Sequence, residues 1–312
     1  MNFKKNVGIV LSLYVFFVFL FFALVYKQKA HKPYLSIVCT TSIVGDTVQQ
    51  IVGDLFVVQN LMGPGVDPHL YKPVENDIMK IAQADIIFYS GLHLEAQMEH
   101  IFKQLERSKI TVAITKNIPR ENLIASFEYE NNYDPHVWFD PLLWIQTIEI
   151  IEQTLSLQDP QNSLVYKKNA EKYINDCKLV FTETKKILDQ IPKERRILIT
   201  GHDAFQYFAQ AYDFEVVGLQ GISTESQVGS QDIQELIDTI VEKQIPAIFI
   251  ETSTPIRNIR ALQEGVAQRG YRVEIGGELF SDALGSLGTE AATYLGMIKT
   301  NIHTIFQALT KK

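Results

Sequence analysis

Short apolar segments alternate with helical segments twice along this chain, once on each side of a long helical stretch. Apolar runs of strand length occur at residues 35–40, 56–61, 86–89, 110–114, 196–200, 215–219, 247–250 and 272–275. Such alternation is typical of parallel sheets with helices on both faces. The sequence therefore predicts an α/β fold with two lobes, each a mostly parallel four-stranded sheet flanked by helices.

The stretch between the two halves predicts one long helix that joins the lobes. Apolar residues keep a helical period over residues 160–190, with many Lys and Glu on the other faces, and Pro192 closes the pattern. About thirty residues at 1.5 Å each span roughly 45 Å, which is longer than a small domain is wide. A chain of 312 residues also suits two domains. The predicted parts are an N-terminal signal or membrane anchor with a linker at 1–34, an N-terminal lobe at 35–157, a connecting helix at 158–191 and a C-terminal lobe at 192–312.

The N-terminus predicts export from the cytoplasm. Lys4 and Lys5 precede an uncharged, Phe-rich run over residues 7–26. Twenty residues suffice to cross a bilayer as a helix, and the run is long for the apolar part of a signal peptide. Residues 27–30 make a poor cleavage site, and no cysteine follows before Cys39. We expect an uncleaved helix that tethers the protein to the membrane, in the periplasm or at the cell surface. The alternative is a cleaved signal that releases it.

Composition excludes some classes of partner and site. The chain is 46% apolar and 21% charged, as folded proteins are. Its net charge of −7 argues against nucleic acid, whose phosphates require clustered Lys and Arg. Cys39 lies in a strand pattern and Cys177 in a helical one, so we interpret both as small buried apolar residues. A disulfide between them is the alternative.

An Asp-Pro-His sequence occurs twice in the first half, at residues 67–69 and 134–136. Proline restricts the residue before it to extended conformations, so each histidine is presented from a stiff turn. Such a turn is a suitable way to hold a metal ligand. His69 and His136 are therefore candidate metal ligands.

Two candidates in the second half complete a possible metal site. His202 follows the first predicted strand of that half, and Asp282 follows the last. In parallel sheets, ligands bind at the carboxyl ends of the strands. If the lobes face each other, three imidazoles and one carboxylate make a tetrahedral ligand set for a divalent transition metal.

Six segments in this order resemble the TroA-type solute-binding proteins of metal ABC transporters, the helical-backbone class that binds zinc or manganese. The segments are Asp67–His69, Asp134–Trp138, Thr200–Phe205, Ile222–Glu225, Ile248–Glu251 and Gly276–Asp282. The resemblance runs from about residue 35 to the C-terminus. It implies an extracytoplasmic receptor that delivers a divalent metal to an ABC permease with a cytoplasmic ATPase. It also implies that the metal ligands are His69, His136, His202 and Asp282.

Three departures from the family pattern bear on the metal and the anchor. The third ligand can be Glu in members that deliver manganese or iron, and here it is His202. Many zinc-dedicated members carry a long His-rich loop, whereas residues 126–134 are acidic and lack His. Lipidated members have a cysteine at the cleavage site, and this chain does not. Three imidazoles favour zinc, so we expect Zn²⁺ or Mn²⁺ as the transported ion, with iron a poorer fit. We also expect a monomer.

Two other functions fit a metal site. A zinc-dependent hydrolase keeps one coordination position open for water, whereas four protein ligands close the site. A surface adhesin with an incidental metal is the second alternative. We expect a protein that is not an enzyme.

The remaining polar residues receive simpler interpretations. We interpret His93, Glu95 and His100 as a solvated helix face. Glu251 either orients His202 or caps the following helix. We interpret three further carboxylates mainly as turn residues, with the orientation of a metal-binding histidine as the alternative role. They are Asp67, Asp134 and Asp140.

Overall fold

The first half of the chain forms a four-stranded sheet in which all neighbouring strands are parallel, in the order β2-β1-β3-β4. The computed structural model describes residues 35–126, 132–225 and 228–311. The strands are β1 (Ile37–Cys39), β2 (Val58–Asn60), β3 (Ile86–Tyr89) and β4 (Ile110–Ala113), and the helices are α2 (Ser42–Val52), α3 (Glu75–Gln83) and α4 (Glu99–Leu105). Ile81 of α3 and Phe102 of α4 share a buried apolar cluster with Ile87 of β3. These two helices therefore cover one face of the sheet.

The second half contains four strands that pair in parallel as β5 with β6 and β7 with β8. The strands are β5 (Ile197–His202), β6 (Glu215–Gln220), β7 (Ala247–Glu251) and β8 (Glu274–Leu279), and the helices are α7 (Gln206–Tyr212), α8 (Ser230–Glu242) and α9 (Ile256–Gln268). Strands β5 and β7 lie side by side. At the end of this contact the Glu251 carboxylate, rather than a strand carbonyl, accepts the His202 backbone N–H at 2.9 Å. The four strands are thus two adjoining parallel pairs.

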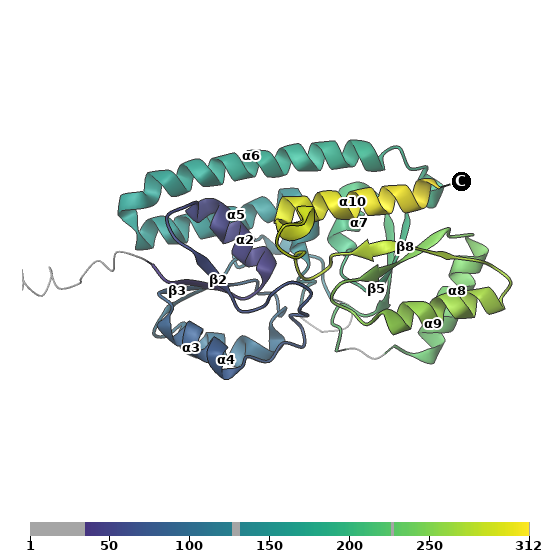
Figure 1. The fold of residues 1–312 in the computed structure, drawn as a ribbon, viewed down its shortest axis with the longest axis horizontal. Coiled ribbons are helices and arrows are strands. Elements are labelled where there is room, and N and C mark those ends of the chain that lie inside the picture. The colour runs from purple at the N-terminus through teal and green to yellow at the C-terminus, as the bar shows by residue number, and fades with distance from the viewer. Residues whose placement is uncertain (1–34, 127–131, 226–227, 312) are drawn as a thin grey trace, which may run out of the picture. The chain divides into compact units, whose positions relative to one another are not determined.

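A long helix, α6 (Ser163–Leu188), packs on α2, on α5 (Pro141–Gln158) and on α10 (Tyr294–Thr310) (Figure 1). Its buried residues form one stripe at helical spacing, from Tyr166 to Leu188. Its 26 residues span about 39 Å. The predicted α/β class with a long helix is confirmed, although α6 is shorter than residues 160–190 because a 3-10 turn occupies Pro160–Asn162.

The C-terminal helix α10 also connects the two halves. The Tyr294 backbone N–H donates to Asp46 Oδ2 at 2.8 Å, and the Tyr294 hydroxyl donates to the Trp138 carbonyl at 2.8 Å. Later turns of α10 pack on β8. Both halves belong to one compact unit over residues 36–312.

Two local features complete the description. A 3-10 turn (Ala96–Met98) precedes α4, and Gly229 is the residue in the cap position of α8. Cys39 and Cys177 are both buried and free, as the interpretation as apolar residues requires. The N-terminal anchor prediction falls on residues 1–34 and lies outside the described residues. Within the part of the chain that the structure describes, no helix is long and apolar enough to span a membrane.

Candidate metal centre

Four predicted side chains converge on one point: His69, His136, His202 and Asp282. Each offers one donor atom, these atoms lie within 4.8 Å of one another, and all four residues are buried. They come from the loop after β2, the segment between β4 and α5, the end of β5 and the loop after β8. His202 is the last residue of β5 rather than a loop residue. The carboxyl ends of the strands thus meet here, as the fold class predicts.

The two Asp-Pro-His sequences form the same local turn. Asp67 Oδ1 accepts the His69 backbone N–H at 2.9 Å, and Asp134 Oδ1 accepts the His136 backbone N–H at 2.9 Å. An aspartate that bonds the backbone two residues later closes an Asx-turn, and proline stiffens it. The repeated sequence therefore forms the same Asx-turn twice, and each turn presents a histidine.

Three separations between donor atoms match the edges of a tetrahedron around a small cation. Metal–nitrogen distances of about 2.0–2.1 Å require donor–donor edges of about 3.3–3.4 Å. His69 Nε2 and His136 Nε2 lie 3.3 Å apart. Asp282 Oδ1 lies 3.4 Å from His136 Nε2, and Asp282 Oδ2 lies 3.4 Å from His202 Nε2. Because each carboxylate oxygen faces a different imidazole, Asp282 can bind a cation through one oxygen or both.

Carboxylates behind two of the rings fix their orientation. Asp134 Oδ1 lies 2.7 Å from His136 Nδ1, and Glu251 Oε2 lies 2.5 Å from His202 Nδ1. A carboxylate at Nδ1 keeps the proton there and turns Nε2 towards the metal position. Glu251 therefore orients His202, and the residue in the cap position of α9 is Pro255.

The other two candidate carboxylates act differently. Asp67 Oδ2 accepts the Thr224 hydroxyl at 2.6 Å, so Asp67 joins the loop of His69 to the second half of the chain. Asp140 accepts the backbone N–H groups of Leu142 and Leu143 at the start of α5. Asp140 is therefore a helix cap and has no contact with the four converging side chains.

Asp282 is positioned by residues that sequence reasoning missed. The Ser253 hydroxyl donates to Asp282 Oδ2 at 2.9 Å. The Trp138 indole N–H donates to the carbonyl of Ser281 at 2.9 Å, which anchors the loop beside Asp282. Ser253 lies just after β7, and only its position at a strand end could have indicated a role.

Charges within the centre shift the pKa values in opposite directions. Burial lowers the pKa of His69 to about 3. Burial also opposes charge on His136, but Asp134 and Asp282 raise the pKa of His136 to about 9. Against the same effect of burial, Glu251 and Asp282 hold the pKa of His202 well above its usual range.

The pKa of the Asp282 carboxylate shifts in the opposite direction. Burial favours the neutral form of Asp282, but His202 and His136 hold its pKa well below the usual range. Among the described residues, His202 Nε2 and Asp282 Oδ1 are buried without a hydrogen-bond partner. Such atoms are costly in a protein interior, and a cation between them satisfies both. The donor set therefore fits a divalent ion.

The prediction for the segment around His93 is wrong in one respect. Glu95 is buried, and it accepts the Thr40 hydroxyl at 2.6 Å and the Ser90 backbone N–H at 2.8 Å. It is thus a structural carboxylate rather than part of a solvated face. His93 and His100 are exposed, as predicted.

Comparison with known proteins gives one consistent result. Residues 37–308 match the family ZnuA, described as zinc-uptake complex component A, periplasmic. The chain is 43% identical to the manganese-binding lipoprotein MntA of Bacillus subtilis, over 90% of this chain and 92% of that one. It is 42% identical to the zinc-binding protein TroA of Treponema pallidum, over 88% and 89%. The solved structure of periplasmic zinc-binding protein TroA from Treponema pallidum aligns with a TM-score of 0.87 and 41% identity, over 89% of this chain and 100% of that chain.

Proposed function

Because the chain belongs to the ZnuA family of periplasmic zinc-uptake components, we propose that it is an extracytoplasmic metal receptor of an ABC transporter. It captures a divalent transition metal ion in the cleft between its lobes and delivers the ion to a membrane permease driven by a cytoplasmic ATPase. The cargo is Zn²⁺ or Mn²⁺. The ion is held by the four converging side chains, namely His69, His136, His202 and Asp282.

The observation that carries this proposal is the buried set of three imidazoles and one carboxylate, whose donor atoms lie within 4.8 Å of one another. Imidazole suits zinc, and a carboxylate able to use both oxygens also suits manganese. Zinc binds more tightly than manganese at almost any nitrogen site, so equilibrium affinity alone does not determine the ion delivered in the cell.

Finer features of the proposal follow from the sequence. The N-terminal segment tethers a monomer to the membrane, and the receptor comprises lobes at 35–157 and 192–312 joined by the segment 158–191. The protein is not an enzyme, because a catalytic zinc needs an open position for water and here four protein groups surround the metal position.

A deletion strain tests the function in the cell. Loss of the gene should prevent growth in metal-depleted medium and lower the cellular content of one metal, measured by elemental analysis. Wild type should restore both, and Asp282→Ala should restore neither. His100→Ala, which changes an exposed histidine away from the centre, is the matched control and should complement fully. Complementation by Asp282→Ala would overturn the proposed site.

A further inference from the structure

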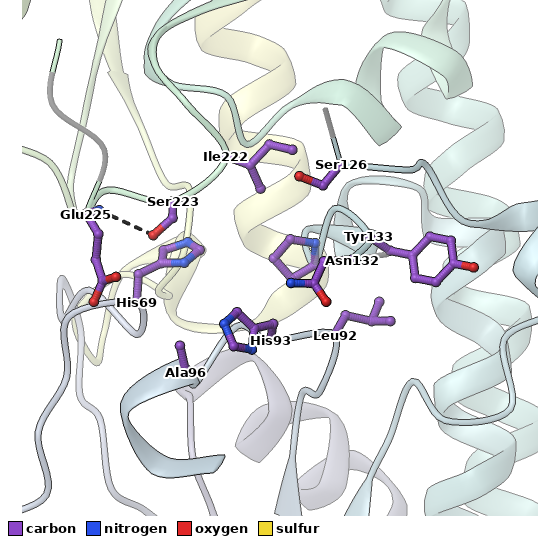
Figure 2. A pocket seen from close by; sticks show the side chains of 11 residues that line it. His69, Leu92, His93, Ala96, Ser126, Asn132, Tyr133, Ile222, Ser223 and Glu225 are labelled. Carbon is purple, nitrogen blue, oxygen red and sulfur yellow. Dashed lines mark hydrogen bonds between the residues drawn. The ribbon is translucent and has the colours of Figure 1, made fainter. Parts of the chain in front are cut away.

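A pocket beside the metal centre opens on one of the four proposed ligands. His69 lines this pocket, together with His93, Ser223 and Glu225, which are not among the ligands (Figure 2). Among the described residues that line it, none is Lys or Arg. His69 therefore lies between the buried centre and a surface that offers an imidazole and a carboxylate to a cation.

The backbone that presents His93 adopts a conformation that side chains rarely tolerate. Gly91, Leu92 and His93 have φ angles of 90°, 53° and 69°, so three consecutive residues lie in the left-handed region. Glu95 holds this turn by accepting the backbone N–H of Gly91 as well as that of Ser90. Strain of this kind persists where the surroundings impose it, and it clusters at functional sites.

The ring of His93 is held in the same way as the rings of the centre. His93 Nδ1 lies 2.6 Å from Glu99 Oε1, just as carboxylates hold Nδ1 of His136 and His202. This contact leaves Nε2 of a half-exposed ring for another partner. Figure 2 shows the rings of His93 and His69 near each other at one end of the pocket.

Glu225 places a carboxylate at the same end of the pocket (Figure 2). The Gln97 side-chain amide donates to Glu225 Oε1 at 2.6 Å, which joins the second half of the chain to the first. This bond fixes one oxygen of an exposed carboxylate in the pocket that His93 also lines. An oriented imidazole and a fixed carboxylate in one pocket both offer donor atoms that divalent cations accept.

We propose that His93 and Glu225 form a capture site at which an incoming divalent cation exchanges water for protein ligands before it passes to His69. In this exchange His93 Nε2 replaces one water of the hydrated ion, and His69 Nε2 then displaces His93 as the ion enters the centre. His93 is a transient ligand and does not hold the ion in the final complex. This inference rests on the proposed function, because it concerns the route to the same centre.

A ligand used only in transit lowers the barrier in both directions. Its loss should therefore slow association and dissociation of the metal by the same factor and leave Kd unchanged. His93→Asn suits the test because asparagine tolerates the left-handed backbone but lacks the imidazole. His100→Asn is the matched control, since His100 is exposed nearby and does not line the pocket.

Stopped-flow mixing with Zn²⁺, followed by tryptophan fluorescence, measures the association rate, because the ring of Trp138 lies 5.2 Å from that of His136. A chromophoric chelator that traps released Zn²⁺ measures dissociation. In His93→Asn both rates should fall roughly tenfold, an effect typical of losing an oriented group at a metal site. Glu225→Gln, which retains the bond from Gln97, should slow association and weaken its dependence on salt.

Two results would overturn this inference alone. Zinc binding to the wild type with unchanged rates in His93→Asn would show that His93 takes no part in the route. A raised Kd that arises only from faster dissociation would place His93 in the final complex or in its support. Absence of zinc binding by the wild type would instead remove the proposed function itself, together with the capture site.

Discussion

The buried histidines of the centre lead to a quantitative prediction about protons released when a metal binds. A metal ligand must be a neutral imidazole, so any proton on Nε2 has to leave. His136, with a pKa of about 9, and His202, with a pKa well above its usual range, carry protons at pH 7 in the metal-free protein. His69, with a pKa of about 3, is already neutral. Metal binding at pH 7 should therefore release about two protons.

The sign and size of the pH dependence follow from this count. Protons on groups with raised pKa values oppose the metal, so affinity rises with pH and levels off only above those pKa values. Two protons correspond to about 100-fold in Kd per pH unit, or about 2.7 kcal/mol, between about pH 5 and pH 8. Three histidines of ordinary pKa would release almost no protons above about pH 7.5.

A single substitution isolates the contribution of His136. Asp134→Asn retains an oxygen that can accept the His136 backbone N–H but removes the charge that holds the proton on the ring. Burial then dominates, the pKa of His136 falls, and release at pH 7.5 should drop from about two protons to about one. Asp140→Asn is the matched control, because asparagine also caps a helix and Asp140 does not contact the centre.

Calorimetric titration with zinc in buffers of different ionisation enthalpy measures the released protons directly. The buffer-dependent part of the heat should correspond to about two protons for the wild type and for Asp140→Asn. A count near zero for the wild type at pH 7.5 would refute the assigned charges. An unchanged count in Asp134→Asn would refute the role of Asp134.

The remaining predictions concern stability and accessibility. Asp140→Ala removes the acceptor at the start of α5, so it should lower the free energy of unfolding by about 1 kcal/mol in urea titrations and leave zinc affinity unchanged. A loss of zinc affinity would contradict the assignment of Asp140 as a helix cap alone. Burial raises the pKa of Cys177 to about 12 and that of Cys39 well above its usual range, so a thiol reagent should modify neither cysteine until the protein unfolds. Rapid modification of either cysteine under native conditions would refute their burial. Free zinc at 100 times Kd should raise the free energy of unfolding by about 2.7 kcal/mol, and an unchanged melting curve would contradict binding to the folded state.

The sequence was sufficient to predict the fold class and, provided that the two lobes face each other, the convergence of the four side chains. Strand-length apolar runs alternating with helical patterns indicate parallel sheets, and parallel sheets bring their carboxyl ends to one edge. His69 and Asp282 lie far apart in the chain, yet each follows a strand, which places both at such an edge. The Asp-Pro-His repeats supplied a local reason for two of the histidines.

Features that depend on contacts between distant segments could not be predicted. Glu95 lies in a polar helical pattern, and its burial results from Thr40 and Ser90, which belong to other segments. Ser253 contacts Asp282 only because β7 and β8 pair, and no local motif marks it. The contact of Glu251 with His202 was one of two possibilities, and only the adjacency of β5 and β7 decides between them.

Anomalous diffraction from crystals of the zinc-loaded protein locates the metal ion and its ligands directly. We expect one peak at the zinc edge, at about 2.0–2.2 Å from Nε2 of three histidines and from the carboxylate of the aspartate. The expected ligands are His69, His136, His202 and Asp282. A peak located away from these residues, or one at which water replaces any of the four, would refute this set of metal ligands.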